Sequence, residues 1–310
     1  MRTLPAQGYD VVGIDVRASP FTHHVGSITD RAFVAEHMHG ADVVLHTATL
    51  HKPHVATHSR HDFVATNIEG TLNLLEEAVA ADVAAFVLTS TTSAFGRALT
   101  PPPGAPAAWV TEDLLAVPRN IYGVTKIAAE NLGELFHHLY GLPCVVLRTS
   151  RFFPEDDDQL SVRQGFSGPN AKVNELLNRR VDIEDVVSAH VVAAERAAAI
   201  GFGRYIISAT TPFTSDDRQQ LRDDAPAVVA RVVPAYVDVF ARHGWTMTAS
   251  LDRVYVNGLA RTELGWQPQW DFARAVARLA ETDDVRSPLA IEIGSRGYHP
   301  ETFAEGPYPV

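Results

Sequence analysis

Three successive segments determine the predicted fold. They are ADVVLHTA (41–48), HSRHDFVATNIEGTLNLLEEAVAAD (58–82) and AAFVLTSTTS (84–93). The first and third segments are short and continuously apolar, which is typical of strands buried on both faces. The middle segment carries apolar residues at helical spacing. A strand, a helix and a second strand in this order form a unit whose strands run parallel. The stretch therefore predicts a parallel sheet covered by helices.

The same alternation continues on both sides of this unit. DVVGIDV (10–16) and PCVVLRTS (143–150) read as strands, and DRAFVAEHM (30–38) and residues 120–140 read as helices. Apolar strands separated by helices indicate a sheet with helices on both of its faces. We therefore predict an α/β fold with a doubly wound parallel sheet.

The chain has 310 residues, enough for one large domain or two smaller ones. We assign residues 1–150 to the sheet domain, in which 97–109 is a loop rich in proline, glycine and alanine. After residue 150 the alternation loosens. We expect residues 151–310 to form mainly a small cap, interleaved with the last strands of the sheet.

Composition narrows the functional class. The net charge is −11 and no cluster of lysine and arginine occurs, which argues against nucleic-acid and anionic-membrane partners. No apolar run approaches the roughly 20 residues that span a membrane, and the N-terminus does not read as a signal peptide. Cys144 is the single cysteine, so no internal disulfide forms, and we expect it to be a buried core thiol. We expect a cytoplasmic protein.

Tyr122 and Lys126 lie four positions apart in NIYGVTKIAAE (120–130). At about 100° per residue, they sit one above the other on a helix. A lysine ammonium lowers the pKa of a nearby phenol, and such a pair can give a proton to a carbonyl or take one from an alcohol. The alternative is an exposed tyrosine beside a solvated lysine.

Ligand-binding residues are expected at the carboxyl ends of the strands. Asp15 ends the first strand, where a carboxylate can accept the ribose hydroxyls of an adenosine. The small residues 47–49 end the second strand and let a ligand approach the backbone. The hydroxyl residues 90–92 end the third strand. We expect these groups and Tyr122 to face one site.

Six motifs together resemble the extended short-chain dehydrogenase/reductases, in the NAD-dependent sugar epimerase/dehydratase family. They are YGVTK (122–126), TSTTSAFG (89–96), NIEGTLNLLEEA (67–78), HTATLHKP (46–53), RRVDIEDVVSAH (179–190) and ARTELGWQPQWDF (260–272). The resemblance covers about residues 8–280. It implies a Rossmann-type domain, a nicotinamide cofactor and a homodimer formed through the helices at 58–82 and 120–140.

The resemblance also implies residue roles. The catalytic group comprises Tyr122 as general acid/base, Lys126, which binds the nicotinamide ribose and lowers the tyrosine's pKa, and Thr91, which holds the substrate oxygen. The remaining cofactor residues would be Asp15, Arg17, Ser27, Ile28, Thr47, Ala48, Thr49 and Thr89. Substrate residues would be His51, Thr92, Thr149, Ser150 and Arg180. Asn67 is expected to be a structural hydrogen-bonding residue.

Two assignments have open alternatives. Asp15 suggests NAD over NADP, because a carboxylate repels a 2′-phosphate, but Arg17 nearby can accept one. Arg180 is a candidate for a substrate phosphate, with a salt bridge to Asp182, Glu184 or Asp185 as the alternative.

The glycine-rich phosphate loop of the family is absent from this sequence. The acidic ribose ligand normally follows that loop by about 20 residues, so the loop would lie before Met1. We expect the first strand of the sheet, between those of residues 10–16 and 41–48, to be missing. An incomplete N-terminus would explain this better than a real protein without the strand. If the start is genuine, the chain would be a non-catalytic binding or regulatory relative.

The reaction type follows from the residues after Thr91. Family dehydratases carry Asp-Glu there, whereas this chain has Thr92-Ser93, so dehydration is disfavoured. Epimerisation or oxidoreduction of a nucleotide-sugar-like substrate remains, with an NAD(P)H-dependent reductase of a small non-sugar carbonyl as the nearest alternative. No metal site is expected, although four histidines between 51 and 61 have helical spacing. The acidic run 155–158 reads as a solvated loop.

Overall fold

The computed structural model describes residues 1–295, 297, 299 and 303. Its centre is a parallel sheet in the order β3 (Val43–His46), β4 (Ala85–Thr91), β6 (Cys144–Thr149) and β7 (Phe202–Ile207). The two central strands β4 and β6 are almost entirely buried, and the predicted strands at 41–48, 84–93 and 143–150 are confirmed within a few residues. The register pairs Thr91 with Thr149, so hydroxyl-bearing strand ends lie side by side.

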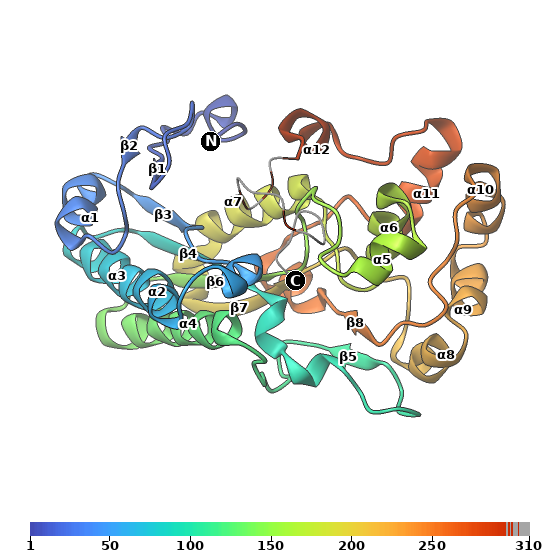
Figure 1. Ribbon diagram of the computed structural model, residues 1–310. Helices are drawn as coiled ribbons and strands as arrows, with labels where there is room; N and C mark the ends of the chain where they lie inside the picture. Colours follow the sequence, from blue (N-terminus) through green and yellow to red (C-terminus); the bar gives the residue numbers. More distant parts are fainter. Residues whose placement is uncertain (296, 298, 300–302, 304–310) are drawn as a thin grey trace.

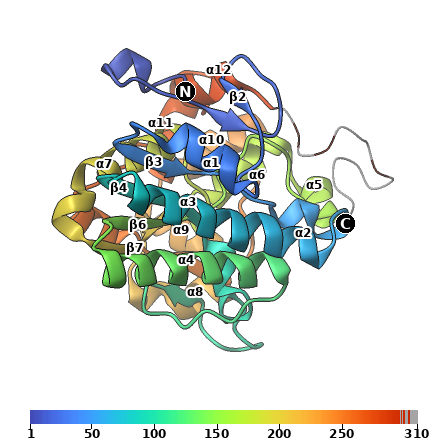
Figure 2. The ribbon, with the colours of Figure 1, turned by 90° about the vertical axis from the view of Figure 1, so that its left-hand side faces the viewer.

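Helices cover both faces of this sheet, as predicted. On one face lie α1 (Arg31–Met38), α3 (Gly70–Ala80) and α4 (Ile121–Tyr140), and Figure 2 shows α3 and α4 side by side. On the other face, α7 (Ile183–Ile200) packs on β4 and β6. Gly133 lets α4 approach β6, because a Cβ there would lie 2.7 Å from the Cys144 sulfur. Cys144 is fully buried, as predicted.

The expected single helix over 58–82 is wrong in one respect. It divides into α2 (Arg60–Val64), a π-helical turn (Ala65–Glu69) and α3. In this π-helical turn, the buried Asn67 side chain accepts hydrogen bonds from Thr49 and Leu50, in the segment that follows β3. Such turns interrupt helices most often near functional sites.

The sheet is interrupted at the predicted place. β1 (Ile14–Asp15) pairs only with β2 (His24–Val25), and the two form a separate sheet. Among the described residues no strand lies between β1 and β3, and Figure 1 shows β1 and β2 standing apart from β3. The N-terminal residues form a short 3-10 turn, Pro5–Gln7.

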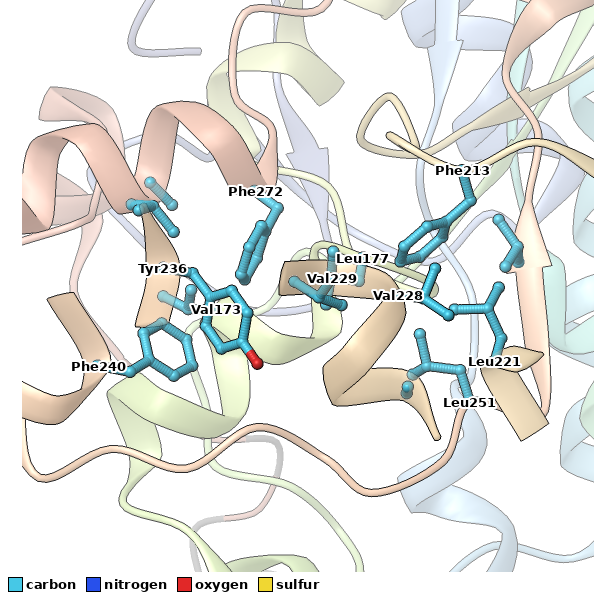
Figure 3. Close-up of a cluster of buried hydrophobic side chains, with 14 of the residues drawn as sticks. Val173, Leu177, Phe213, Leu221, Val228, Val229, Tyr236, Phe240, Leu251 and Phe272 are labelled. Atoms are coloured by element: carbon cyan, nitrogen blue, oxygen red, sulfur yellow. The ribbon is translucent and has the colours of Figure 1, made fainter. Parts of the chain in front are cut away.

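Helices with their own hydrophobic core form the cap (Figures 1 and 3). They are α5 (Leu160–Gly165), α6 (Gly168–Glu175), α8 (Arg218–Asp223), α9 (Ala225–Val232), α10 (Tyr236–His243) and α11 (Phe272–Glu281). The ring of Phe272 lies 6.0 Å from that of Phe240 and 6.2 Å from that of Tyr236. A small sheet of β5 (Ala108–Val110) and β8 (Arg253–Tyr255) and helix α12 (Pro288–Ile293) complete the fold.

Candidate active site

A cavity of about 690 Å³ lies beyond the carboxyl ends of β3, β4 and β6. Its floor is formed by residues that end these strands, among them Thr47, Thr91 and Thr149. The opposite wall comes from the segment after β6, from α7 and from β8. The structure therefore places a cavity at the edge of the sheet where the sequence predicts a site.

Tyr122 lies in the first turn of α4 and faces this cavity. Asn120 caps the helix, because its side-chain oxygen accepts the N–H of Gly123 at 3.1 Å. The Tyr122 side chain is buried and forms a hydrogen bond with the side chain of Thr91. The predicted pairing of a phenol with a strand-end hydroxyl is present in the structure.

The ionisation of Tyr122 differs from the prediction. Burial raises the pKa of Tyr122 to about 12, and the hydrogen bond from Thr91 opposes this shift. The lysine-induced lowering of the pKa expected from the sequence is wrong for this structure, because desolvation of the phenolate outweighs the neighbouring groups. Tyr122 is therefore a neutral proton donor at pH 7.

Lys126 lies one helical turn after Tyr122 and is almost completely buried. Its ammonium donates a hydrogen bond of 2.8 Å to the carbonyl of Thr89. Burial lowers the pKa of Lys126 to about 8, against the opposing effect of the Glu130 carboxylate. The lysine is therefore held behind Thr89, outside the cavity wall itself, in its charged form at pH 7.

Glu130 was not predicted from the sequence. It is fully buried, accepts a 2.5 Å hydrogen bond from the Ser90 hydroxyl and pairs with Arg148 at 2.7 Å. These contacts join α4 to β4 and β6 directly beneath Tyr122 and Lys126. The sequence feature that could have identified Glu130 is its spacing. Residues 122, 126 and 130 are four positions apart and form one stripe on the helix.

Three of the predicted cofactor residues, Thr47, Thr49 and Thr89, line the cavity, whereas Ala48 is not in its wall. The Thr49 hydroxyl donates to the Asn67 side-chain oxygen at 2.9 Å. The amide of Asn67 donates in turn to Thr125 of α4 at 3.0 Å. The structural role predicted for Asn67 is confirmed, since it ties the segment after β3 to α4.

The other predicted cofactor residues lie away from the cavity. Asp15 is exposed at the end of β1, and its carboxylate accepts the N–H of Arg17 at 2.8 Å. Ser27 bonds Thr29, and Ile28 is buried against Gly70 of α3. These residues stay together around β1 and β2, but none of them lines the cavity.

Four of the five predicted substrate residues line the cavity: His51, Thr92, Thr149 and Ser150. The ring of His51 lies 5.9 Å from that of Tyr122, and burial together with the charge of Lys126 lowers the pKa of His51 to about 3. The Ser150 hydroxyl is buried and has no hydrogen-bond partner among the described residues.

Arg180 lies outside the cavity. Its Nε donates to Glu175 at 2.7 Å and its Nη1 to the carbonyl of Phe153 at 2.9 Å. Its ion-pair partner is therefore Glu175, and not the three carboxylates considered from the sequence. Arg179, the preceding residue, lines the cavity instead.

The acidic run at 155–158 is not a solvated loop. Asp157 and Asp158 are buried, and both pair with Arg151. Arg179 pairs with Asp157 at 2.8 Å, and Lys52 pairs with Asp158. The prediction failed because tertiary contacts bring Lys52 and Arg179 to this run beside the nearby Arg151.

The comparisons with known proteins give the family. The model of the NAD dependent epimerase/dehydratase family matches residues 1–207, two-thirds of the chain. The chain belongs to this family.

Two relatives from the family represent different reactions. UDP-glucose 4-epimerase of Rhizobium leguminosarum is 27% identical over 278 residues, which cover 81% of this chain and 80% of that protein. dTDP-glucose 4,6-dehydratase of Streptomyces antibioticus is 29% identical over 261 residues, which cover 82% and 73%. The relatives are thus nucleotide-sugar epimerases and dehydratases.

The fold is shared with solved members of the superfamily. A crystal structure of a short-chain dehydrogenase/reductase superfamily protein from Agrobacterium tumefaciens with bound NAD superposes with a TM-score of 0.61. The sequences are 22% identical, and 94% of each chain is covered. The predicted Rossmann-type α/β fold is confirmed.

The residues present fit the two ends of the family's cofactor. Thr47, Thr49 and Thr89 in the cavity wall would suit the nicotinamide riboside end, and the Lys126 ammonium is buried behind them on the carbonyl of Thr89. The exposed Asp15 carboxylate at the end of β1 suits ribose hydroxyls. For the pyrophosphate, the described residues contain no glycine-rich turn at a helix N-terminus, and residues 1–4 form the neighbouring cavity wall.

Two further findings concern other kinds of site. Within the described residues no group of three or more histidine, cysteine or acidic side chains is arranged to hold a metal ion, although the rings of His54 and His58 lie 5.1 Å apart. None of the helices in the described part of the chain has the length and apolar character needed to cross a membrane.

Proposed function

We propose that this protein is an NAD-dependent epimerase or oxidoreductase that acts on an alcohol or carbonyl group of a nucleotide-sugar-like substrate. The observation that carries the proposal is the hydrogen-bonded pair of Tyr122 and Thr91 in a buried cavity, with Lys126 one turn along the same helix. We prefer NAD to NADP because the Asp15 carboxylate at the end of β1 would repel a 2′-phosphate.

Tyr122 is the proton-transfer group in this mechanism. Because its pKa is about 12, the phenol is protonated at pH 7 and donates its proton to a substrate carbonyl oxygen. Thr91 holds the same oxygen, since its hydroxyl already lies within hydrogen-bond distance of the phenol. The Lys126 ammonium lies one helical turn along α4 and would favour the phenolate that forms, although burial keeps the pKa of Tyr122 raised in this structure.

A bound NAD would supply the redox chemistry, as the acceptor or donor of a hydride. Thr47, Thr49 and the Lys126 ammonium would hold its riboside end. The buried positions of Tyr122 and Thr91 reduce the solvent around the reacting oxygen, which strengthens the electrostatic interactions there. The chain's own residues thus orient the substrate and move its proton.

Epimerisation or simple oxidoreduction is favoured over dehydration. A dehydratase needs an acid to expel a hydroxyl, and Thr91 is followed by Thr92 and Ser93. The carboxylates in the cavity wall come from residues 155–158, and Asp158 is bound to Lys52 and Arg151.

A non-catalytic binding protein is the second candidate. It is favoured by one observation, the position of Asp15, Arg17, Ser27 and Ile28 outside the cavity. The retained Tyr122, Lys126 and Thr91 argue for the enzyme.

The experiment that separates the two is an NMR assay. The protein is incubated with NAD and UDP-glucose or UDP-galactose, and the anomeric signals are followed. Epimerisation, or NADH formation with net oxidation, that disappears in Tyr122→Phe supports the enzyme. Nucleotide-sugar binding with no turnover of either sugar supports the binding protein.

We further propose a homodimer. α3 and α4 lie side by side on the outer surface (Figure 2), and α4 exposes Val124, Leu135, Leu139 and Tyr140. Pairing these helices with their copies in a second chain would cover this apolar surface.

A further inference from the structure

Arg253 of β8 lines the cavity with one side of its guanidinium group unused. Its Nη1 donates to the carbonyl of Leu99 at 3.5 Å and to Asp252 at 3.2 Å. Its Nε is buried and has no acceptor among the described residues. A buried donor without an acceptor is costly, so an unpaired Nε indicates a partner that is bound from outside the chain.

Arg119 lines the same cavity. It precedes Asn120, the N-cap of α4, and donates to the Thr100 hydroxyl. In the described part of the chain no carboxylate pairs with Arg119. Since Arg119 and Arg253 contact the adjacent residues Thr100 and Leu99, their two guanidinium groups are neighbours.

Unlike Arg119, the arginines at the cap end of the cavity form several ion pairs. Arg151 pairs with Asp157, Asp158 and Glu175, and Arg179 pairs with Asp157 and Glu175. These two arginines are neutralised within the protein. The less compensated positive charge lies around Arg119 and Arg253.

This charge lies near the reacting group. Arg119 is three residues before Tyr122, so their Cα atoms are at most about 11 Å apart. Both residues line the cavity, as do Gly96 and Leu99. A group bound there would share the cavity with Tyr122.

We propose that Arg119 and Arg253 bind a carboxylate on the reacting sugar, so that the substrate is an acidic nucleotide sugar. The proposal rests on the proposed function for the position of the sugar. The Nε–Nη2 edge of a guanidinium group binds a planar carboxylate through two parallel hydrogen bonds. A carboxylate there would satisfy Arg253 Nε and compensate the charge of Arg119.

The test is calorimetric binding of UDP-glucuronate, UDP-glucose and UDP to the 310-residue protein and to Arg119→Gln, Arg253→Gln and the double variant. Arg97→Gln is the matched control, because Arg97 is exposed on the neighbouring 3-10 turn and is not in the cavity wall. We expect the wild type and the control to bind UDP-glucuronate at least about 10-fold more tightly than UDP-glucose. Each arginine variant should lose most of this preference, with UDP affinity unchanged.

Two results would overturn the proposal. One is a wild-type protein that binds UDP-glucuronate no more tightly than UDP-glucose. The other is an equal loss of UDP affinity in the variants, which would assign the arginines to the diphosphate. Arg119 is exposed, so its variant should fold even if Arg253→Gln does not. Because the readout is binding, a failure of catalysis by Tyr122 would leave this test intact.

Discussion

At the residue scale, the chemistry depends on one buried phenol. Tyr122 is desolvated, hydrogen-bonded to Thr91 and one helical turn from the Lys126 ammonium. Burial of the lysine lowers its pKa to about 8, so its charge diminishes above that pH. The tyrosine can therefore act as a proton donor, and the hydrogen bond from Thr91 favours the phenolate that proton transfer leaves.

Replacing Tyr122 with phenylalanine should abolish proton transfer and preserve the fold. We expect kcat to fall by about 10²- to 10⁴-fold, which is the usual contribution of a general acid. The thermal midpoint should change little, because only the hydroxyl is lost. Steady-state kinetics and thermal unfolding of the wild type and Tyr122→Phe measure both. A variant with unchanged kcat would contradict the role of Tyr122.

The sequence predicted the identity of these residues better than their ionisation. Tyr122, Lys126 and Thr91 could be found because spacing on a helix and position at a strand end are local properties. The pKa of Tyr122 depends on burial by the whole fold, which no local pattern contains. The partners of Glu130 and Asp157 are likewise set by tertiary contacts.

At the element scale, the end of β3 carries a buried histidine. His46 bonds Thr71 of α3 at 2.9 Å, and burial with the charge of Lys126 lowers its pKa to about 3. The native state keeps this histidine neutral, whereas the unfolded chain takes up a proton below about pH 6.5. The unfolded state thus binds more protons between pH 3 and 6.5, and stability falls as the pH falls through this window.

His46→Gln should reduce this acid sensitivity. We expect the wild-type free energy of unfolding to lose about 1.4 kcal/mol per pH unit below pH 6.5 through His46, and the variant to lack this contribution. Urea unfolding at pH 7 and pH 5 measures the difference. His39→Gln is the control, because His39 is exposed at the end of α1. Equal pH slopes in both variants would show that His46 does not couple folding to pH.

The cap should depend on its aromatic core (Figure 3). Phe272 is fully buried between α10 and α6, so Phe272→Ala should cost about 3–5 kcal/mol of stability. Ala277→Ser, at an exposed position of the same helix, is the control. Chemical denaturation followed by tryptophan fluorescence measures the change. A cost below about 1 kcal/mol would show that the cap core is loosely packed.

Element boundaries were predicted to different degrees. The strands of the central sheet follow from continuous apolar runs such as PCVVLRTS. The π turn at Ala65–Glu69 could not be predicted, because it is stabilised by the contacts of Asn67 with the segment after β3 and with α4. The loop predicted at 97–109 ends in strand β5, which exists only because β8 pairs with it.

At the scale of the whole molecule, the interrupted sheet was predictable and the cap was not. The distance from Asp15 to the chain start was enough to expect a gap between β1 and β3. The cap core joins residues from 107 to 279 through contacts that are distant in the sequence. Periodicity within a segment carries no information about such contacts.

The proposed dimer predicts a mass change on mutation. Leu135→Glu with Leu139→Glu places charges on the exposed stripe of α4 and should convert a dimer into a monomer. Sedimentation velocity gives the mass, and circular dichroism checks the fold. Substituting Leu115, which is 79% exposed outside these helices, with glutamate is the control. A wild-type monomer would contradict the proposed dimer.

The measurement that tests the central claim most directly is calorimetric titration of the 310-residue protein with NAD and with NADP. We expect NAD to bind more tightly than NADP. We also expect NAD to bind more weakly to Lys126→Met and to Asp15→Ala than to the wild type. The account also predicts a modest affinity, because the described residues offer no glycine-rich cradle for the pyrophosphate. The absence of any NAD binding, or a preference for NADP that Asp15→Ala leaves unchanged, would contradict the account of this chain as an NAD-dependent enzyme.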